Sequence, residues 1–142
     1  MNPAFLRAVV DALLPAEADP PADRTPLRSG TAAGVDLARY PEEAQPVLEI
    51  IAARSGGETA FLAAAPEARA ESILAVEDAA PQALQSLLSR ILPDYYEQPA
   101  VLSAFGWTIE PPQPHGHALA EMDPQARAAL ERVRRRGKIW RG

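Results

Sequence analysis

Apolar residues recur at helical spacing in several short stretches of this chain, and prolines separate those stretches. The strongest pattern lies between Pro81 and Pro93, where leucine and isoleucine side chains follow i, i+3, i+4, i+7, i+8 spacing at Leu84, Leu87, Leu88, Ile91 and Leu92. Residues 3–14 form a similar apolar stripe, with Asn2 suited to cap the helix and Pro3 suited to its first turn. No stretch alternates apolar and polar residues over a convincing length, so the pattern predicts an all-α fold.

Proline and glycine punctuation predicts where the other helices begin and end. We expect a short helix over 31–40 capped near Thr31, a break and restart between Pro41 and Pro46, and an end at Ser55-Gly56-Gly57. Further helical segments are expected from Glu58 through Leu62, from Pro66 with Ile73, Leu74 and Val76 as its core side, over 100–105, and from Asp123-Pro124 to about Arg136. The prediction is a single compact bundle of about six short helices with long proline-rich loops. Its helical domain spans 1–122, followed by a C-terminal helix and basic tail at 123–142.

Four of the chain's aromatic residues lie in one short stretch, LPDYYEQPAVLSAFGW at 92–107. Neighbouring helix positions point about 100° apart, so Tyr95 and Tyr96 are not both expected to face the core. We expect Pro93 to kink or end the preceding helix, Phe105 to point inward, and at least one tyrosine to remain outside with Trp107. Tyrosine, tryptophan and arginine are enriched at binding hot spots, which favours a protein-binding surface here.

Composition narrows the classes of function. The chain has 142 residues, enough for one domain, and no cysteine, which excludes disulfides, thiolate zinc sites and iron–sulfur centres. Residues 1–126 carry seven Arg against eighteen Asp and Glu, and residues 127–142 carry seven Lys and Arg against Glu131. An acidic body followed by a basic tail suggests electrostatic complementarity to a partner. No stretch approaches the roughly 20 apolar residues of a membrane span.

Catalytic motifs are absent from the sequence. No GxSxG, HExxH, nucleophile–histidine arrangement or glycine-rich phosphate loop occurs, so we expect no catalytic and no cofactor-binding residues. His115 and His117, with Glu121 or Asp123 nearby, could present metal ligands, but nothing in this Pro/Gly-rich loop fixes them, and we expect no metal site. A small enzyme that uses one of these histidines is the weakest of the open alternatives.

The basic end RVRRRGKIWR at 132–141 admits a second class of function. Its cations could neutralise phosphates while Trp140 stacks on a base, as in a nucleic-acid-associated adaptor. Cations at a helix C-terminus also offset the macrodipole, and the acidic body would repel nucleic acid. We therefore expect nucleic acid only as the alternative partner.

The order of these features resembles a known family. The matching features are an LLP-type helix end at Val10–Pro15, the small-residue patch Ser29-Gly30-Thr31, Phe61-Leu62 before the helix 66–78, and Tyr95-Tyr96, Pro99 and Phe105-Gly106. Together they resemble the small (gamma, subunit 3) component of gluconate 2-dehydrogenase-type flavoprotein oxidoreductases over residues 3–107.

This resemblance implies a non-catalytic accessory subunit that binds and stabilises a large FAD-dependent sugar or alcohol dehydrogenase of the glucose-methanol-choline type. FAD is then expected in the partner subunit and not in this chain. The expected partner-binding residues are Tyr95, Tyr96, Trp107, Arg134, Arg135, Arg136 and Trp140. The sequence shows no twin-arginine motif, so we expect a cytoplasmic location as it stands, or a periplasmic one if a signal was removed or the complex is co-exported.

Overall fold

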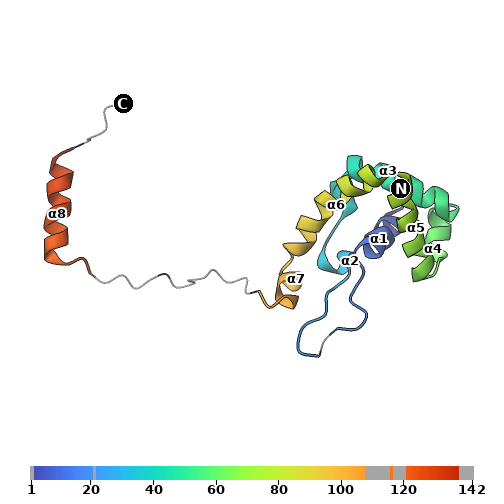
Figure 1. The fold of residues 1–142 in the computed structure, drawn as a ribbon, viewed down its shortest axis with the longest axis horizontal. Coiled ribbons are helices and arrows are strands. Elements are labelled where there is room, and N and C mark those ends of the chain that lie inside the picture. Colours follow the sequence, from blue (N-terminus) through green and yellow to red (C-terminus); the bar gives the residue numbers. More distant parts are fainter. Residues whose placement is uncertain (1, 21, 108–115, 117–120, 138–142) are drawn as a thin grey trace. The chain divides into compact units, whose positions relative to one another are not determined.

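The computed structural model describes residues 2–20, 22–107, 116 and 121–137, and in these residues the chain is all-α, with no strand. The chain divides into two compact units, Met1–Ile109 and Glu110–Gly142. The first unit contains α1 (Pro3–Leu13), α2 (Gly30–Ala33), the 3-10 turn η1 (Leu37–Arg39), α3 (Pro41–Ser55), α4 (Glu58–Ala63), α5 (Pro66–Ala79), α6 (Pro81–Tyr96) and α7 (Pro99–Ala104) (Figure 1). The second contains α8 (Pro124–Arg135). The expected all-α fold is confirmed.

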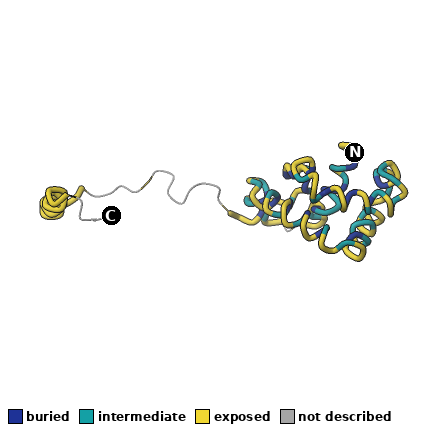
Figure 2. Tube along the Cα trace, turned by 90° about the horizontal axis from the view of Figure 1, so that it is seen from above, coloured by how far each residue is buried: buried dark blue, intermediate teal, exposed yellow. Residues whose placement is uncertain are grey.

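The helices of the first unit pack around one apolar core. Helix α3 packs against α5 and α6, and α1 packs against α2, α4 and α5. Buried positions follow the inner side of each helix (Figure 2). Phe5 of α1 and Phe61 of α4 meet edge to face with ring centroids 5.4 Å apart. The largest fully buried side chains are Phe5, Val9, Val10, Leu37, Val47, Ile51, Phe61, Val76, Leu87, Ile91 and Val101.

Most helix ends lie where the punctuation predicted them. The side chain of Asn2 caps α1 by accepting from the Ala4 amide at 2.9 Å. Gly56 ends α3 in the left-handed region at φ 78°, and Asp123 caps α8 by accepting from the Gln125 and Ala126 amides. The end of α8 at Arg135 is followed by Gly137 at φ 68°, as expected.

The expected break at Pro46 and the expected helix end at Pro93 are wrong, because α3 and α6 both continue through their internal prolines. A proline inside a helix loses one backbone hydrogen bond and clashes with the preceding turn, at a cost of about 3 kcal/mol. Ile91 precedes Pro93 and Tyr95 follows it, and the continuous helix α6 keeps both side chains buried. Burial of a large side chain contributes about 1.5–3 kcal/mol, enough to offset much of that cost.

Two further expectations are corrected. The segment 31–40 is not one helix, since Ser29 caps the short α2 and Gly34, at φ 101°, ends it before η1 begins. Leu74 does not face the core and is 59% exposed. Leu74 and the buried Val76 are two positions apart on α5, and at about 100° per residue they point to opposite sides of that helix.

Gly30 is the point where the proline-rich loop 14–29 returns to α1. Its amide donates to the carbonyl oxygen of Leu14 at 2.8 Å, and an added Cβ would lie 2.7 Å from Val10 Cγ1. Thr31 then donates its amide to Asp11 Oδ1 and its hydroxyl to the carbonyl oxygen of Arg7. The small-residue patch 29–31 therefore lets the loop and α1 approach closely.

Candidate protein-binding surface

The two adjacent tyrosines at the end of α6 point to different environments. Tyr95 is 5% exposed and belongs to the core, whereas Tyr96 is 49% exposed. Their rings meet edge to face with centroids 5.4 Å apart. The expectation that only one of the pair faces the core is confirmed, and Tyr96 is the tyrosine that remains on the surface.

Tyr95 fastens the end of α6 to the proline-rich loop. Its hydroxyl donates to the backbone carbonyl oxygen of Arg28 at 2.7 Å, across 67 residues of sequence. Burial raises the pKa of the Tyr95 phenol, and the nearby Tyr96 and Glu17 raise that pKa further. The loop is held in turn by Glu17, which accepts from the Arg24 guanidinium and from the Leu27 amide.

Three aromatic side chains lie exposed where α6 and α7 end, and we call Tyr96, Phe105 and Trp107 the aromatic patch. Phe105 is 51% exposed and Trp107 is 69% exposed. The rings of Tyr96 and Phe105 are tilted at 40° with centroids 6.0 Å apart. The inward placement expected for Phe105 is therefore wrong. Helix α7 ends at Ala104 and turns its buried positions, Val101 and Ala104, to the core, so Phe105 instead lies beside Tyr96.

Trp107 is held by the turn that ends α7. The Gly106 amide donates to the carbonyl oxygen of Ser103 at 3.0 Å, and the Trp107 amide donates to that of Leu102 at 3.0 Å. Gly106 adopts φ 73°. This pair of bonds around a left-handed glycine is a Schellman motif, which satisfies the last carbonyls of the helix. The motif fixes the backbone of Trp107, so part of the ordering cost of binding is met before a partner arrives.

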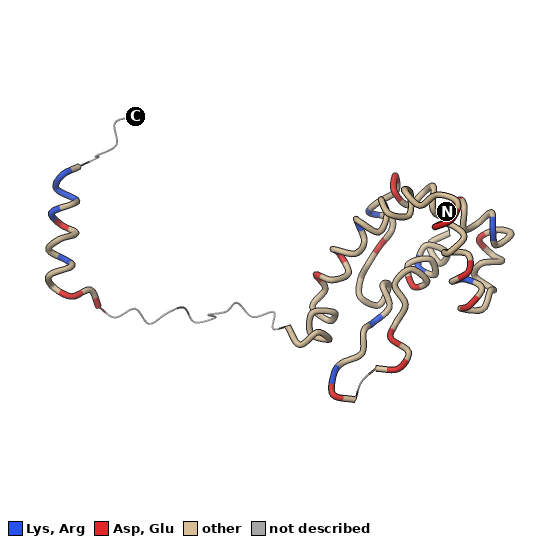
Figure 3. Tube along the Cα trace, in the orientation of Figure 1, with Lys and Arg blue, Asp and Glu red and all other residues tan. Residues whose placement is uncertain are grey.

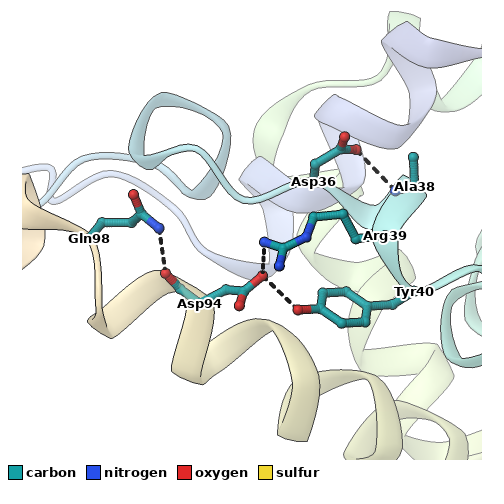
Figure 4. A network of polar contacts seen from close by, with 6 residues as sticks. All are labelled: Asp36, Ala38, Arg39, Tyr40, Asp94 and Gln98. Carbon is teal, nitrogen blue, oxygen red and sulfur yellow. Dashed lines mark hydrogen bonds and ion pairs between the residues drawn. The ribbon is translucent and has the colours of Figure 1, made fainter.

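A cluster of polar contacts around Asp94 holds the C-terminal end of α6 in place (Figure 4). Asp94 Oδ2 accepts from the Tyr40 hydroxyl and from Arg39 Nη1, both at 2.7 Å. Gln98 donates its side-chain amide to the backbone carbonyl oxygen of Asp94 at 2.8 Å. The bond to Asp94 raises the pKa of Tyr40, and desolvation raises it further. This cluster joins α6 to η1 and to the start of α3.

A second ion pair joins α6 to α3. Arg90 Nε lies 2.8 Å from Glu43 Oε1. The pKa of Glu43 is lowered chiefly by a hydrogen bond from its own backbone amide and also by Arg90. With Tyr95 and Asp94, this pair makes three polar attachments that hold the helix carrying Tyr96 against the rest of the unit.

The arginines predicted to bind a partner lie in the second unit. Arg134 and Arg135 belong to α8, and Arg136 is its C-terminal cap residue; all three are exposed. Arg135 lies 3.9 Å from Glu131, one turn earlier. Figure 3 shows the basic residues gathered toward the C-terminal end of this helix. Trp140 lies outside the described residues.

Within the described residues, no group of His, Cys, Asp and Glu side chains is arranged to hold a metal ion. His115 and His117 lie outside those residues. The described helices also include none long and apolar enough to cross a membrane.

No protein-family model, no curated protein and no solved structure matches this chain. Of the residues predicted from sequence to bind a partner, Tyr96 is exposed at the end of α6 and Trp107 is exposed just after α7, and the buried Tyr95 contacts the ring of Tyr96. Phe105 was missed as a surface residue, and the signal for it was the adjacent Gly106, which ends the helix before Phe105 can be covered.

Proposed function

We propose that this chain is a non-catalytic small subunit that binds a larger protein through the aromatic patch. The observation that supports this proposal is the exposure of Tyr96, Phe105 and Trp107 on a support fastened by Tyr95, Asp94 and the Schellman motif. Large apolar side chains that are both exposed and held in place are typical of binding hot spots.

We further propose that the partner is a large FAD-dependent dehydrogenase of the glucose-methanol-choline type. The support for this identity is the resemblance of residues 3–107 to the small subunit of gluconate 2-dehydrogenase-type oxidoreductases. On this proposal FAD and the reacting atoms belong to the partner, and this chain stabilises the folded partner by mass action. At a hundredfold excess over Kd such binding contributes about 2.7 kcal/mol to the partner's free energy of unfolding.

Co-expression tests the proposal. A tagged form of this chain is produced with a large FAD-dependent dehydrogenase from the same cell, and the purified material is examined for flavin absorbance and for the mass of the complex. We expect a yellow complex whose flavoprotein is recovered in higher yield than when it is expressed alone. Recovery of this chain without flavin, together with an unchanged yield of flavoprotein, would contradict the assigned partner.

A further inference from the structure

The aromatic patch lies where two helices of the first unit have their negative ends. Helix α6 ends at Tyr96 and α7 ends at Ala104, and neither has a basic residue in its last turn. The C-terminus of a helix carries a partial negative charge, which a nearby cation stabilises. Glu97, the C-cap residue of α6, adds a full negative charge, and Figure 3 shows α7 without any charged residue. The two helix ends and Glu97 therefore favour a cation at the patch.

The arginines of the neighbouring elements are committed elsewhere. Arg39 and Arg90 are each held in an ion pair with a carboxylate. Arg28 lies on the proline-rich loop, where its carbonyl oxygen accepts from the buried Tyr95. Tyr95 and Glu97 are two positions apart, so at about 100° per residue they point to opposite sides of α6. Among the described residues, the exposed Glu97 forms no ion pair.

Arginine side chains already lie over two other rings of the first unit. The guanidinium carbon of Arg39 lies 5.5 Å from the ring centroid of Tyr40, and that of Arg69 lies 5.6 Å from the ring centroid of Phe61. Over the ranges that the structure describes, no arginine lies in this way on a ring of the aromatic patch. The faces of aromatic rings attract cations, and tryptophan attracts them most strongly. The patch thus combines ring faces that carry no cation with a carboxylate that has no ion pair.

We propose that the segment of the partner that binds the aromatic patch carries an arginine, whose guanidinium stacks on the patch and pairs with Glu97. This inference rests on the proposed function, since it names the chemistry of the segment that the patch binds. Arginine fits better than lysine, because its planar guanidinium can stack on a ring while it donates to a carboxylate. Residues 1–107 carry fifteen Asp and Glu against seven Arg, and this net charge of −8 steers a basic segment toward the unit.

Matched peptides test the inference without the flavoprotein. The full chain, labelled with ¹⁵N, is titrated from about 0.1 mM to about 20 mM with acetyl-Gly-Leu-Arg-Leu-Gly-amide, and amide shifts give the Kd. A second peptide replaces the arginine with citrulline, which keeps the planar shape and lacks the charge, and a third replaces it with lysine. We expect the arginine peptide to shift the amides of residues 96–107 and the indole of Trp107. The citrulline peptide should bind at least about fivefold more weakly, and the lysine peptide should also bind more weakly.

A variant of Glu97 tests the ion pair. Glu97→Gln keeps the size of the side chain and removes its charge, so it should weaken binding of the arginine peptide about threefold to fivefold. The same variant should bind the citrulline peptide as the parent chain does. Glu77→Gln removes a carboxylate from an exposed position on α5 and is the matched control, with an expected Kd equal to that of the parent chain.

Three results would overturn the inference. They are the absence of amide shifts up to the highest concentration, shifts that lie outside residues 96–107, and equal binding of the arginine and citrulline peptides. If the flavoprotein still co-purifies with the chain in these cases, the proposed function stands and the arginine does not. Binding of the arginine peptide in a chain that recovers no flavoprotein would support the inference and contradict only the assigned partner.

Discussion

The hydroxyl of Tyr95 donates a 2.7 Å hydrogen bond to the backbone carbonyl oxygen of Arg28, so the end of α6 and the proline-rich loop are fastened to each other. The next side chain along α6, Tyr96, points to solvent beside Phe105. One residue of the tyrosine pair thus supports the surface that its neighbour forms.

Removal of the Tyr95 hydroxyl should destabilise the first unit without changing its surface. Tyr95→Phe loses the hydrogen bond and leaves the Arg28 carbonyl without this donor, which should lower the free energy of unfolding by about 0.5–1.5 kcal/mol. Urea unfolding followed by far-UV circular dichroism measures the change. Tyr96→Phe is the matched control, and we expect its unfolding midpoint to equal that of the parent chain. Equal effects of the two substitutions would contradict the assigned roles.

Gly30 should tolerate no side chain. In Gly30→Ala the new Cβ would lie 2.7 Å from Val10 Cγ1 and 2.9 Å from Leu14 Cβ, so α1 or the loop must shift. Overpacking of this kind costs about 1–3 kcal/mol, which thermal and urea unfolding can detect. Because Val10→Ala removes the nearest atom, the added cost of Gly30→Ala should be smaller in that background. Strict additivity of the two substitutions would show that this close approach is not the cause.

Asp94 should contribute more to the free energy of unfolding than its exposed partner Arg39. Asp94→Ala leaves both Tyr40 and Arg39 without their acceptor and should cost about 1–3 kcal/mol. Arg39→Ala breaks one ion pair of a largely exposed side chain and should cost less than about 1 kcal/mol. Glu97→Ala, at an exposed position on the same end of α6, is the control. A larger loss of unfolding free energy in Arg39→Ala than in Asp94→Ala, measured by urea unfolding, would contradict the central role of Asp94.

Stability should fall at both ends of the pH scale. Tyr40 and Tyr95 have pKa values raised above 10.0, so above about pH 10 the unfolded chain loses protons that the folded chain keeps, and stability decreases as pH rises. Glu17 and Glu43 have pKa values lowered below 4.5, so the unfolded chain takes up protons first as pH falls through that region, and stability decreases there too.

Unfolding midpoints in urea between pH 3 and pH 11 test this expectation. A plateau is expected from about pH 5 to about pH 9, the interval in which none of these four groups titrates in either state. Tyr95→Phe should make the decline above pH 10 shallower, since it removes one of the two tyrosines responsible. A decline that is identical in Tyr95→Phe would mean that other groups cause it.

Much of the fold could be predicted from sequence because its signals are local. Asn2, Gly56 and Asp123 act through bonds within their own turns, and the apolar spacing of α6 reports directly on its buried side. The continuation of α3 through Pro46 and of α6 through Pro93 could not be predicted from such local signals. Whether a helix continues past a proline depends on the contacts made by the residues that follow it. In α6 the Tyr95 hydroxyl donates a hydrogen bond to the carbonyl oxygen of Arg28, 67 residues away in sequence, and this bond stabilises the continued helix.

The candidate surface shows the same division between local and distant causes. Neighbouring helix positions diverge by about 100°, so the separation of Tyr95 from Tyr96 followed from sequence alone. Which tyrosine faces the core depends on whether α6 continues past Pro93, because Tyr95 then lies one turn after the buried Ile91. The exposure of Phe105 depends on the early end of α7. Both are consequences of packing between segments that the sequence pattern treats separately.

Loss of Trp107 tests the central claim most directly, because it is the most exposed of the large apolar side chains in the described residues. Binding of the chain to the large FAD-dependent dehydrogenase is measured by calorimetry for the parent, for Trp107→Ala and for Leu74→Ala, which removes another exposed apolar side chain from α5. We predict that Trp107→Ala raises Kd by about thirtyfold, as expected for a hot spot worth about 2 kcal/mol, with an unchanged unfolding midpoint, whereas Leu74→Ala leaves Kd unchanged. Equal Kd values for all three proteins would contradict the claim that the aromatic patch is the binding surface.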